Sequence, residues 1–266
     1  MTIDVPRSYA DAGADPVSAG TGHRTPTLPP ILSARGVRKM YRSGAHEVEA
    51  LRGIDLDVDP GELVMVMGPS GNGKTTMLNC LSGLDDIDAG VVYVDGDEIH
   101  TMPDAKRTEH RARRMGFVFQ SFNLIPVFSA EENVELPLLV TGVKPAEARA
   151  RARAMLRRVS LVRRATHRPN ELSGGEQQRV AVARALVAEP AIIWADEPTG
   201  NLDSRTAGEV IELLEQVHAA GQTLVVITHD RAIGNKGQRL IQVLDGRITY
   251  DGNPAGHLEP ADSPGR

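Results

Sequence analysis

Short, wholly apolar runs alternate with longer mixed segments along this chain, and the two patterns predict different elements. Three of the apolar runs are only strand-length, namely Leu63–Met67, Ile192–Trp194 and Leu224–Ile227. Strands that are buried on both faces of a parallel sheet have this pattern. Each run is followed by polar residues, and ligands bind at the carboxyl ends of the strands in an open α/β sheet. We therefore predict an α/β fold with its site at that edge.

Further strands are predicted before and after these runs. From Ile31 to Glu62, apolar residues recur among polar ones, and Ser43-Gly44 marks a turn between two strands. Residues 91–94 continue the same sheet. Near the end of the chain, two strand-like segments joined by Asp245-Gly246 predict a hairpin.

Between about Thr101 and Glu171 the pattern is helical. Pro145 stands where a first helical turn would start. The apolar residues of one face follow it at helical spacing: Ala148, Ala152, Met155, Leu156 and Val159. Arginines occupy the opposite face, which is compatible with a nucleic-acid patch or with a solvated surface. The formal net charge of −5 favours the solvated surface.

The two ends of the chain differ in composition from the rest. Residues 1–30 are rich in Gly, Ala, Pro, Ser and Thr, and residues 253–266 share this character. We expect a disordered leader over 1–30 and a flexible tail over 253–266. A folded region is then expected over 31–252, with its helical part at about 101–171.

Composition narrows the classes of function. The acidic net charge argues against non-specific nucleic-acid binding. The single cysteine, Cys80, excludes an intramolecular disulfide framework and a cysteine-rich zinc site, and fits a reducing cytoplasm. No apolar run approaches the ~18 residues of a spanning helix, and Met1–Ala10 lacks the apolar region of a secretory signal. We expect a cytoplasmic protein without direct membrane insertion.

The strongest motif is Gly68-Pro69-Ser70-Gly71-Asn72-Gly73-Lys74-Thr75, which matches G-x-x-x-x-G-K-[ST]. It follows a buried strand and precedes a helical run from Thr76, as a phosphate loop requires. Glycines let backbone N–H groups turn towards phosphates, and the helix N-terminus attracts the anion. In such a loop Lys74 reaches the β- and γ-phosphates, and the hydroxyl of Thr75 binds Mg²⁺.

Two adjacent acids, Asp196 and Glu197, end the second apolar run. A buried carboxylate is costly unless it faces a metal ion, so Asp196 is predicted to lie beside Mg²⁺. Glu197 is predicted to be the base that polarises the attacking water. The alternative is that the pair only forms a turn.

Leu172-Ser173-Gly174-Gly175-Glu176 precedes a long helical run, 177–188. Ser173 and Glu176 have the S-x-x-E spacing of a capping box. The two glycines are poor helix formers, each costing up to about 1 kcal/mol relative to alanine. We attribute them to a ligand that approaches the backbone closely, and we expect a second phosphate contact at this helix N-terminus.

In this order, the phosphate loop, the Leu-Ser-Gly-Gly-Glu segment and Asp196-Glu197 resemble the ATP-binding cassette of ABC transporters, from about Ile31 to Gly252. The resemblance implies a phosphate-loop NTPase with a mixed sheet core, an N-terminal antiparallel β subdomain and an inserted α-helical subdomain. It also implies ATP hydrolysis with Mg²⁺ by a head-to-tail dimer. In that dimer the Ser-Gly-Gly segment contacts ATP held by the second copy.

The resemblance assigns roles to four further residues. Gln120 corresponds to the glutamine that senses Mg²⁺ and the attacking water, and the alternative is a polar residue that ends a strand. His229 corresponds to the switch histidine near the γ-phosphate, and the alternative is a structural histidine. Asp203 corresponds to the loop that communicates across the dimer. Tyr41 corresponds to the aromatic residue that stacks on adenine, although a strand tyrosine can also simply pack. The catalytic set is then Glu197, His229 and Gln120, and the metal set Thr75, Gln120 and Asp196. The nucleotide-binding set is Tyr41, Gly68, Pro69, Ser70, Gly71, Asn72, Gly73, Lys74, Thr75, Thr76, Ser173, Gly174, Gly175, Glu176 and Asp203.

Three longer segments, 122–126, 132–138 and 196–204, are similar to the MacB, LolD and FtsE group of this family. Those ATPases serve macrolide export, lipoprotein release and a cell-division permease. The resemblance implies a separate FtsX/MacB-like permease as partner and a peripheral place on the inner face of the cell membrane. The apolar loop at Phe122, Leu124 and Ile125 is predicted to meet that permease, and the alternative is that Phe122 belongs to the core.

Other ATPases of related fold are less compatible with the sequence. A DNA-repair ATPase would place a long coiled coil or a zinc module between the phosphate loop and Ser173, and a translation ATPase would carry two cassettes. A nucleotide-binding scaffold without turnover is the remaining rival. The presence of both Glu197 and His229 favours hydrolysis over that rival.

Overall fold

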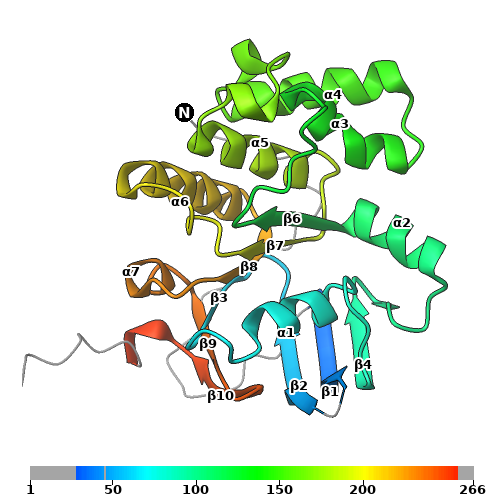
Figure 1. The fold of residues 1–266 in the computed structure, drawn as a ribbon, viewed down its shortest axis with the longest axis vertical. Coiled ribbons are helices and arrows are strands. Elements are labelled where there is room, and N and C mark those ends of the chain that lie inside the picture. The colour runs from blue at the N-terminus through cyan, green and yellow to red at the C-terminus, as the bar shows by residue number, and fades with distance from the viewer. Residues whose placement is uncertain (1–27, 45, 257–266) are drawn as a thin grey trace, which may run out of the picture.

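Two β-sheets form the centre of the computed structural model, which describes residues 28–44 and 46–256 (Figure 1). An antiparallel sheet has the order β2-β1-β4-β5 and consists of β1 (Leu32–Ser43), β2 (His46–Val58), β4 (Ala89–Val94) and β5 (Asp97–Glu98). A second sheet has the order β10-β9-β3-β8-β7-β6. It consists of β3 (Leu63–Met67), β6 (Met115–Phe119), β7 (Ile192–Asp196), β8 (Thr223–Ile227), β9 (Arg239–Leu244) and β10 (Arg247–Gly252).

The second sheet is mixed, because β10 alone runs antiparallel to its neighbour within it. The predicted combination of a mixed sheet with an antiparallel subdomain is therefore confirmed. β10 returns through the turn Asp245-Gly246, where φ is 47° and 72°, as a two-residue hairpin turn needs.

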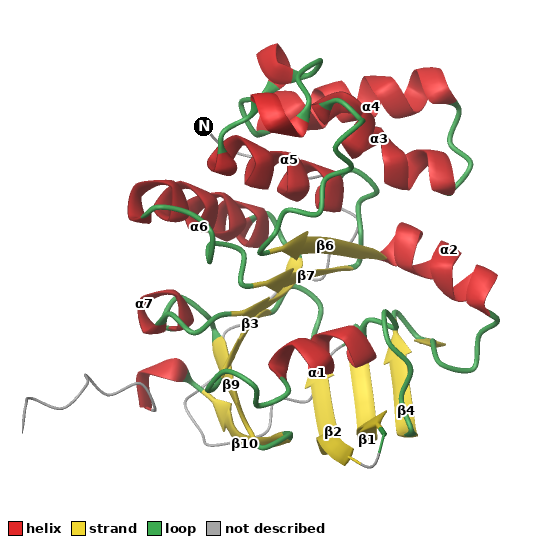
Figure 2. Cartoon of the chain, in the orientation of Figure 1, coloured by secondary structure: helices red, strands yellow, loops and turns green. Residues whose placement is uncertain are grey.

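Helices cover both faces of the mixed sheet (Figure 2). The helices of the described residues are α1 (Lys74–Leu81), α2 (Asp104–Arg114), α3 (Ala130–Val140), α4 (Pro145–Arg158), α5 (Gly174–Leu186), α6 (Ser204–Ala219) and α7 (Arg231–Gly234). Among them, α3 and α4 pack on α5 rather than directly on the sheet. Short 3₁₀ turns follow at Val162–Arg164, Pro169–Glu171 and Pro254–Gly256. Within the described residues, none of these helices combines the length and the apolar character needed to cross a membrane.

The apolar runs have the two buried faces that their sequence predicts. In β3, Leu63, Met65 and Met67 belong to the core shared with α3, α4, α5 and α6. Val64 and Val66 belong to the core shared with α1 and the antiparallel sheet. Successive side chains of a strand point to opposite faces, so a strand between two layers must be apolar at every position.

Arginines of α4 form ion pairs with buried glutamates of the same chain. Arg149 pairs with Glu131 at 3.2 Å and with Glu135 at 3.0 Å, and Arg153 pairs with Glu131 at 2.7 Å. The side chains of the two glutamates, which lie on α3, are only 7% and 4% exposed. A buried carboxylate needs a charged partner, and these arginines supply it for the two glutamates of α3.

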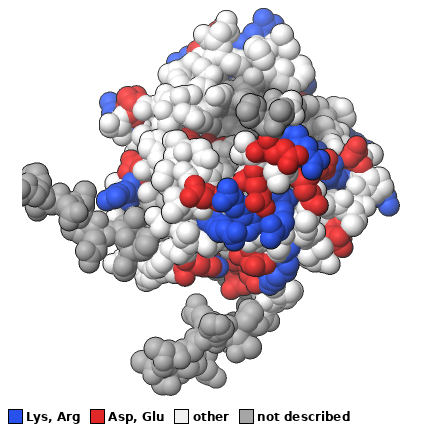
Figure 3. All heavy atoms as spheres, turned by 60° about the horizontal axis from the view of Figure 1, so that its bottom comes forward, with Lys and Arg blue, Asp and Glu red and all other residues white. Residues whose placement is uncertain are grey.

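The side of the molecule shown in Figure 3 carries basic and acidic side chains interleaved. On β1 and β2, Arg35 pairs with Asp57 at 2.6 Å and Arg38 with Glu49 at 2.9 Å. Exposed pairs of this kind contribute little to stability. The surface of this sheet is therefore of mixed sign.

Two expectations about element boundaries differ from the structure. β6 lies inside the range 101–171 that the sequence analysis described as helical, and it is the edge strand of the mixed sheet. Its residues Met115 and Val118 are buried, as in the other apolar runs. The expected tail begins with an ordered turn, since Tyr250 donates to the carbonyl of Asn253 at 2.7 Å. The predicted leader, apart from residues 28–30, and the tail beyond 256 lie outside the described residues.

Candidate nucleotide-binding and hydrolysis site

A cleft of about 540 Å³ opens beside the loop that joins β3 to α1. Residues 71–76 of the loop and of α1 line it together with Tyr41 of β1, several residues of β2 and the turn Asp245-Gly246. Gly68, Pro69 and Ser70 belong to the same loop but do not line this cleft. The structure thus brings the predicted adenine-stacking residue and most of the predicted phosphate loop to one place.

Lys74 lies inside the curve of the loop. Its Nζ donates to the carbonyl oxygens of Gly68 at 2.7 Å and Pro69 at 2.9 Å, and the residue is only 8% exposed. A buried ammonium at the start of α1 forms, with the helix N-terminus, a site that favours an anion. This arrangement suits the phosphates of a nucleotide.

The glycines of the loop are required by its packing within the chain. At Gly68, where φ is 148°, a Cβ would overlap the carbonyl oxygen of Val243 in β9. At Gly73, where φ is 93°, a Cβ would lie 2.6 Å from the carbonyl oxygen of Ala50 in β2. The motif by itself explains these glycines only through the phosphates. The structure adds that the loop is pressed against β9 and β2.

Asn72 ties the loop to the β9–β10 turn. Its Oδ1 accepts from the backbone N–H of Asp245 at 2.8 Å, and its carbonyl accepts from Gly246 at 3.2 Å. Its Nδ2 donates back to the carbonyls of Pro69 and Ser70 at 3.2 Å. The asparagine therefore stabilises the loop from within, a role that the motif alone does not indicate.

Thr75 and Asp196 meet at the carboxyl edge of the sheet. The Thr75 hydroxyl donates to Asp196 Oδ1 at 3.3 Å. Burial raises the pKa of the Asp196 carboxyl, the hydrogen bond from Thr75 opposes this, and the charge of Glu197 raises it further. A hydroxyl beside a partly buried carboxylate is an oxygen donor set of the kind that Mg²⁺ takes. These two residues therefore fit the metal site predicted for them.

Gln120 follows β6 and is engaged by Asn201 rather than by Thr75 or Asp196. Its Nε2 donates to Asn201 Oδ1 at 3.2 Å, and Asn201 Nδ2 donates to the Gln120 carbonyl at 3.0 Å. A Cβ at Gly200 would lie 2.6 Å from Gln120 Nε2, so glycine is needed for this approach. Sequence analysis did not identify Asn201 as a site residue, because the pair joins positions 81 residues apart.

Glu197 and His229, two of the predicted catalytic residues, are in direct contact. His229 Nδ1 lies 2.9 Å from Glu197 Oε2. An ionised carboxylate only accepts, so the histidine nitrogen is the donor. Glu197 has φ of 46°, which is unusual for a residue with a side chain, and its N–H donates to Ile227 of β8 at 3.0 Å. The strained turn between β7 and α6 thus directs the carboxylate towards the end of β8.

The segment 172–176 contributes nothing to the cleft lining. Ser173 is the N-cap of α5 and forms a capping box with Glu176, with hydrogen bonds of 2.8 and 3.3 Å. A Cβ at Gly175 would overlap the Thr206 side chain of α6. The attribution of both glycines to a ligand is therefore incomplete, because packing inside the chain already requires Gly175.

Asp203 is the N-cap of α6. Its Oδ1 accepts from the N–H groups of Arg205 at 3.1 Å and Thr206 at 3.0 Å, and its Oδ2 accepts from the Thr206 hydroxyl at 2.7 Å. These bonds lower the pKa of the Asp203 carboxyl. Its capping role could have been predicted, since aspartate before a helical run is a common helix start.

Two side chains of α5 support the segment around Gln120, and one of them also reaches the loop after Glu197. The amide of Gln178, fully buried, donates to the carbonyls of Phe119 at 3.4 Å and Pro198. Arg184 donates to the carbonyls of Phe122 and Asn123, which have positive φ. Burial lowers the pKa of Arg184 to about 10. Neither residue could be predicted from the sequence, because no motif marks their long-range contacts.

Comparison with known proteins agrees with this geometry. Residues 51–200 match the family described as ABC transporter. The chain belongs to this family. An uncharacterized ABC transporter ATP-binding protein of Thermotoga maritima is 49% identical over 82% of this chain and 93% of its own length. As a member of the ABC transporter family, this chain is an ATP-binding subunit and an ATPase.

Two further relatives have more specific names. The lipoprotein-releasing system ATP-binding protein LolD of Geobacter metallireducens is 46% identical over 83% of this ABC chain and 99% of its own. The macrolide export ATP-binding/permease protein MacB of Nitrosomonas europaea is 46% identical over 84% of this chain, which spans only 34% of that protein. A solved dimer of the cassette MJ0796, bound to ADP and Pi, has a TM-score of 0.78 and 42% identity. That match covers 84% of this chain and 99% of the other.

Proposed function

We propose that this ABC cassette hydrolyses ATP with Mg²⁺ in a head-to-tail dimer and thereby drives a separate FtsX/MacB-like permease. The observation that supports the dimer is the position of Ser173–Gly175, outside the cleft of the phosphate loop. Ser173 is exposed there, at the N-terminus of a capped helix. The N-terminus of a helix attracts anions, and this one lies away from the nucleotide cleft of its own chain. It is therefore suited to bind the nucleotide of a second copy.

Within each site the chain divides the work among four regions. Lys74 holds the phosphates and stabilises the charge of the transferring phosphoryl group. Thr75 and Asp196, with Gln120, would hold Mg²⁺, and the ion would supply charge neutralisation at the phosphates. Glu197 accepts the proton of the attacking water, and His229 orients its carboxylate through the 2.9 Å contact.

The dimer predicts a specific result for Ser173→Arg. We expect nearly unchanged ATP binding by the monomer and loss of ATPase activity, because the bulky cation blocks the other copy's γ-phosphate site. A mixture with Lys74→Ala should recover activity, since one heterodimer site then retains both intact halves. Steady-state phosphate release of the single variants and of the mixture measures this.

Because Ser173→Arg also removes a helix cap, Ser129→Ala serves as the control for the effect of losing a cap. Ser129 is the N-cap of α3 and forms the same kind of capping box with Glu132. Its removal should cost about 1 kcal/mol of stability and leave the ATPase rate close to that of the unmodified protein. Normal hydrolysis by Ser173→Arg alone would show that the site is not shared.

The permease is proposed to dock beside the loop that follows Gln120. Phe122 and Ile125 are half-buried there, Leu124 packs against the core, and Val127 is 68% exposed. Asn133, fully buried in α3, receives the N–H of Ile125 at 2.7 Å and donates to three carbonyls of this loop. The loop is therefore a shaped surface with an apolar side, attached to the residue that is proposed to sense Mg²⁺. The type of permease and the peripheral position at the inner membrane face are inferred from the similarity to LolD and MacB.

Phe122→Ser tests this docking surface. We expect weaker co-purification with the permease and a lower permease-stimulated ATPase rate, while the basal rate of the isolated cassette stays within about twofold. Tyr93→Ser, which removes an aromatic side chain that is 38% exposed on β4 of the antiparallel sheet, is the control. A large drop in melting temperature with loss of basal activity would instead place Phe122 in the core.

A further inference from the structure

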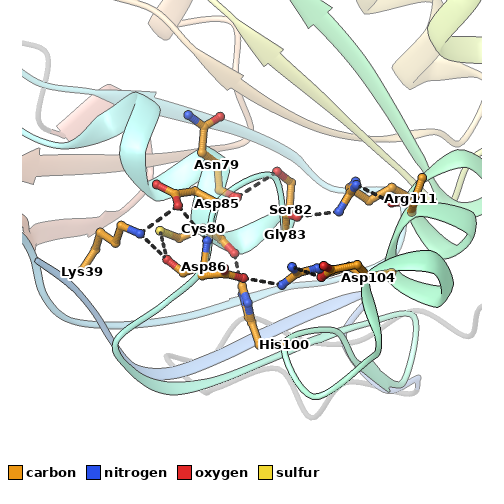
Figure 4. Close-up of polar contacts among 12 residues, drawn as sticks. Lys39, Asn79, Cys80, Ser82, Gly83, Asp85, Asp86, His100, Asp104 and Arg111 are labelled. Carbon is orange, nitrogen blue, oxygen red and sulfur yellow. Dashed lines mark hydrogen bonds and ion pairs between the residues drawn. The ribbon is translucent and has the colours of Figure 1, made fainter. Parts of the chain in front are cut away.

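Tyr41 is held by two charged residues outside every motif. Its hydroxyl donates to Asp85 Oδ2 at 2.8 Å, and the Lys39 ammonium lies over its ring, 5.1 Å from the centroid. Lys39 also donates to Asp85 Oδ1 at 2.8 Å and to the Asp86 carbonyl at 2.7 Å (Figure 4). The phenol, the carboxylate and the ammonium therefore form a closed set of contacts around one face and the end of the ring.

These contacts are fixed to α1. The N–H groups of Leu84 and Asp85 both donate to the Asn79 carbonyl, at 2.8 and 3.0 Å, so the segment with Asp85 wraps around the end of the helix. A cation near the C-terminus of a helix is also stabilised by the helix dipole. The start of the same helix carries Lys74 and lines the nucleotide cleft. Through Asp85, Tyr41 is thus attached to the C-terminal end of the helix whose start carries Lys74, and its hydroxyl also interacts with Thr76 in the first turn of that helix.

The contacts around Tyr41 favour the charged forms of both Lys39 and Asp85. Burial opposes charge on Lys39, but Asp85 outweighs it and raises the pKa of the ammonium. Burial likewise opposes charge on Asp85, but the hydrogen bonds from Lys39 and Tyr41 lower the pKa of the carboxyl. The Lys39 side chain is only 12% exposed. The ring is therefore held by an ion pair that has little freedom to move.

Tyr41 keeps a free surface towards the nucleotide. The residue is 42% exposed and lines the cleft beside residues 71–76. We propose that Asp85 and Lys39 are positioning residues that hold the Tyr41 ring in the orientation on which the adenine base of ATP stacks. This inference rests on the proposed base-stacking role of Tyr41.

The test separates binding of the base from binding of the phosphates. Asp85→Ala and Lys39→Met are expected to raise KM for ATP by about three- to tenfold and to leave kcat within about twofold. This rise in KM corresponds to part of the binding free energy of one base–aromatic stack. Tyr41→Phe should resemble Asp85→Ala, and the double variant should add little to either. Competitive inhibition by inorganic tripolyphosphate, which has no base, should be unchanged in all of them.

Asp86→Ala is the matched control. Its carboxylate lies one residue further along and pairs with Arg107 of α2 at 2.6 Å, away from Tyr41. It should leave KM for ATP unchanged. If Tyr41→Ala raises KM while Asp85→Ala and Lys39→Met do not, the positioning role is wrong and base stacking stands. An equal loss of tripolyphosphate binding would place the effect at the phosphates and also overturn the inference. If Tyr41→Ala itself leaves KM unchanged, stacking and positioning both fail.

Discussion

Glu197→Gln is expected to lower the ATP turnover rate by about 10²- to 10⁴-fold, the usual value of a general base, and to leave ATP affinity nearly unchanged. Glutamine keeps the size of the side chain and can still meet His229, which lies 2.9 Å from the carboxylate. It cannot accept the proton of the attacking water at neutral pH. The chemical step should therefore fail while the phosphate loop, Thr75 and Asp196 still hold the nucleotide.

A cassette that binds ATP without hydrolysing it should accumulate in the dimeric state. Size-exclusion chromatography of Glu197→Gln with ATP and Mg²⁺ is expected to show a dimer that is absent with ADP. Phosphate release measures the loss of turnover. Together, the two measurements distinguish a base from a residue that only shapes the turn.

Glu189→Gln provides a closely matched control. Glu189 is also a glutamate with positive φ, 54° against 46° for Glu197, but its side chain is 61% exposed and pairs with Arg151 of α4 rather than with His229. We expect wild-type turnover from this variant. Unimpaired hydrolysis by Glu197→Gln would remove Glu197 from the catalytic set.

Lys74→Ala is expected to weaken ATP binding by roughly 10- to 100-fold, the value of a charge-assisted hydrogen bond, and to suppress turnover further. The buried ammonium is the only lysine side chain lining the described cleft. It also closes the loop through the carbonyls of Gly68 and Pro69. Its removal therefore takes away the partner of the phosphates and loosens the loop that should surround them.

Binding can be followed through the single tryptophan of the chain. Trp194 lies in β7, two residues before Asp196, and is buried. A fluorescence titration with ATP is expected to give a weaker apparent affinity for Lys74→Ala. Lys236→Ala, which removes an exposed lysine paired with Glu215, should titrate like the unmodified protein. Equal affinity and equal turnover of Lys74→Ala would show that the loop does not hold phosphate.

The sequence alone determined the elements that have a regular local pattern of apolar residues or a characteristic turn. Leu63–Met67 was predicted as a strand with both faces buried, and the structure has β3 over the same residues. The hairpin at Asp245-Gly246 and the apolar face of α4 were predicted with similar success. Local patterns of this kind work because strand and helix periods place side chains on fixed faces wherever the chain folds.

The chemistry of the site was also predictable where it lies in contiguous motifs. A phosphate loop, an acidic strand end and a capping box each need residues at fixed spacing, so the sequence shows them before any fold is known. The structure places Thr75 beside Asp196 and Glu197 beside His229. The roles of these residues in catalysis remain predictions for the variants described above.

Only the tertiary structure decided which distant residues support the motifs. Asn201 holds Gln120, Gln178 joins the loops beside Gln120 and Glu197, and Asp85 holds Tyr41. β6 was hidden among helices for a related reason, since a five-residue strand becomes evident only when β7 pairs with it. Such contacts depend on sheet order and helix packing, which bring together residues far apart in the sequence, and no local period or spacing encodes them.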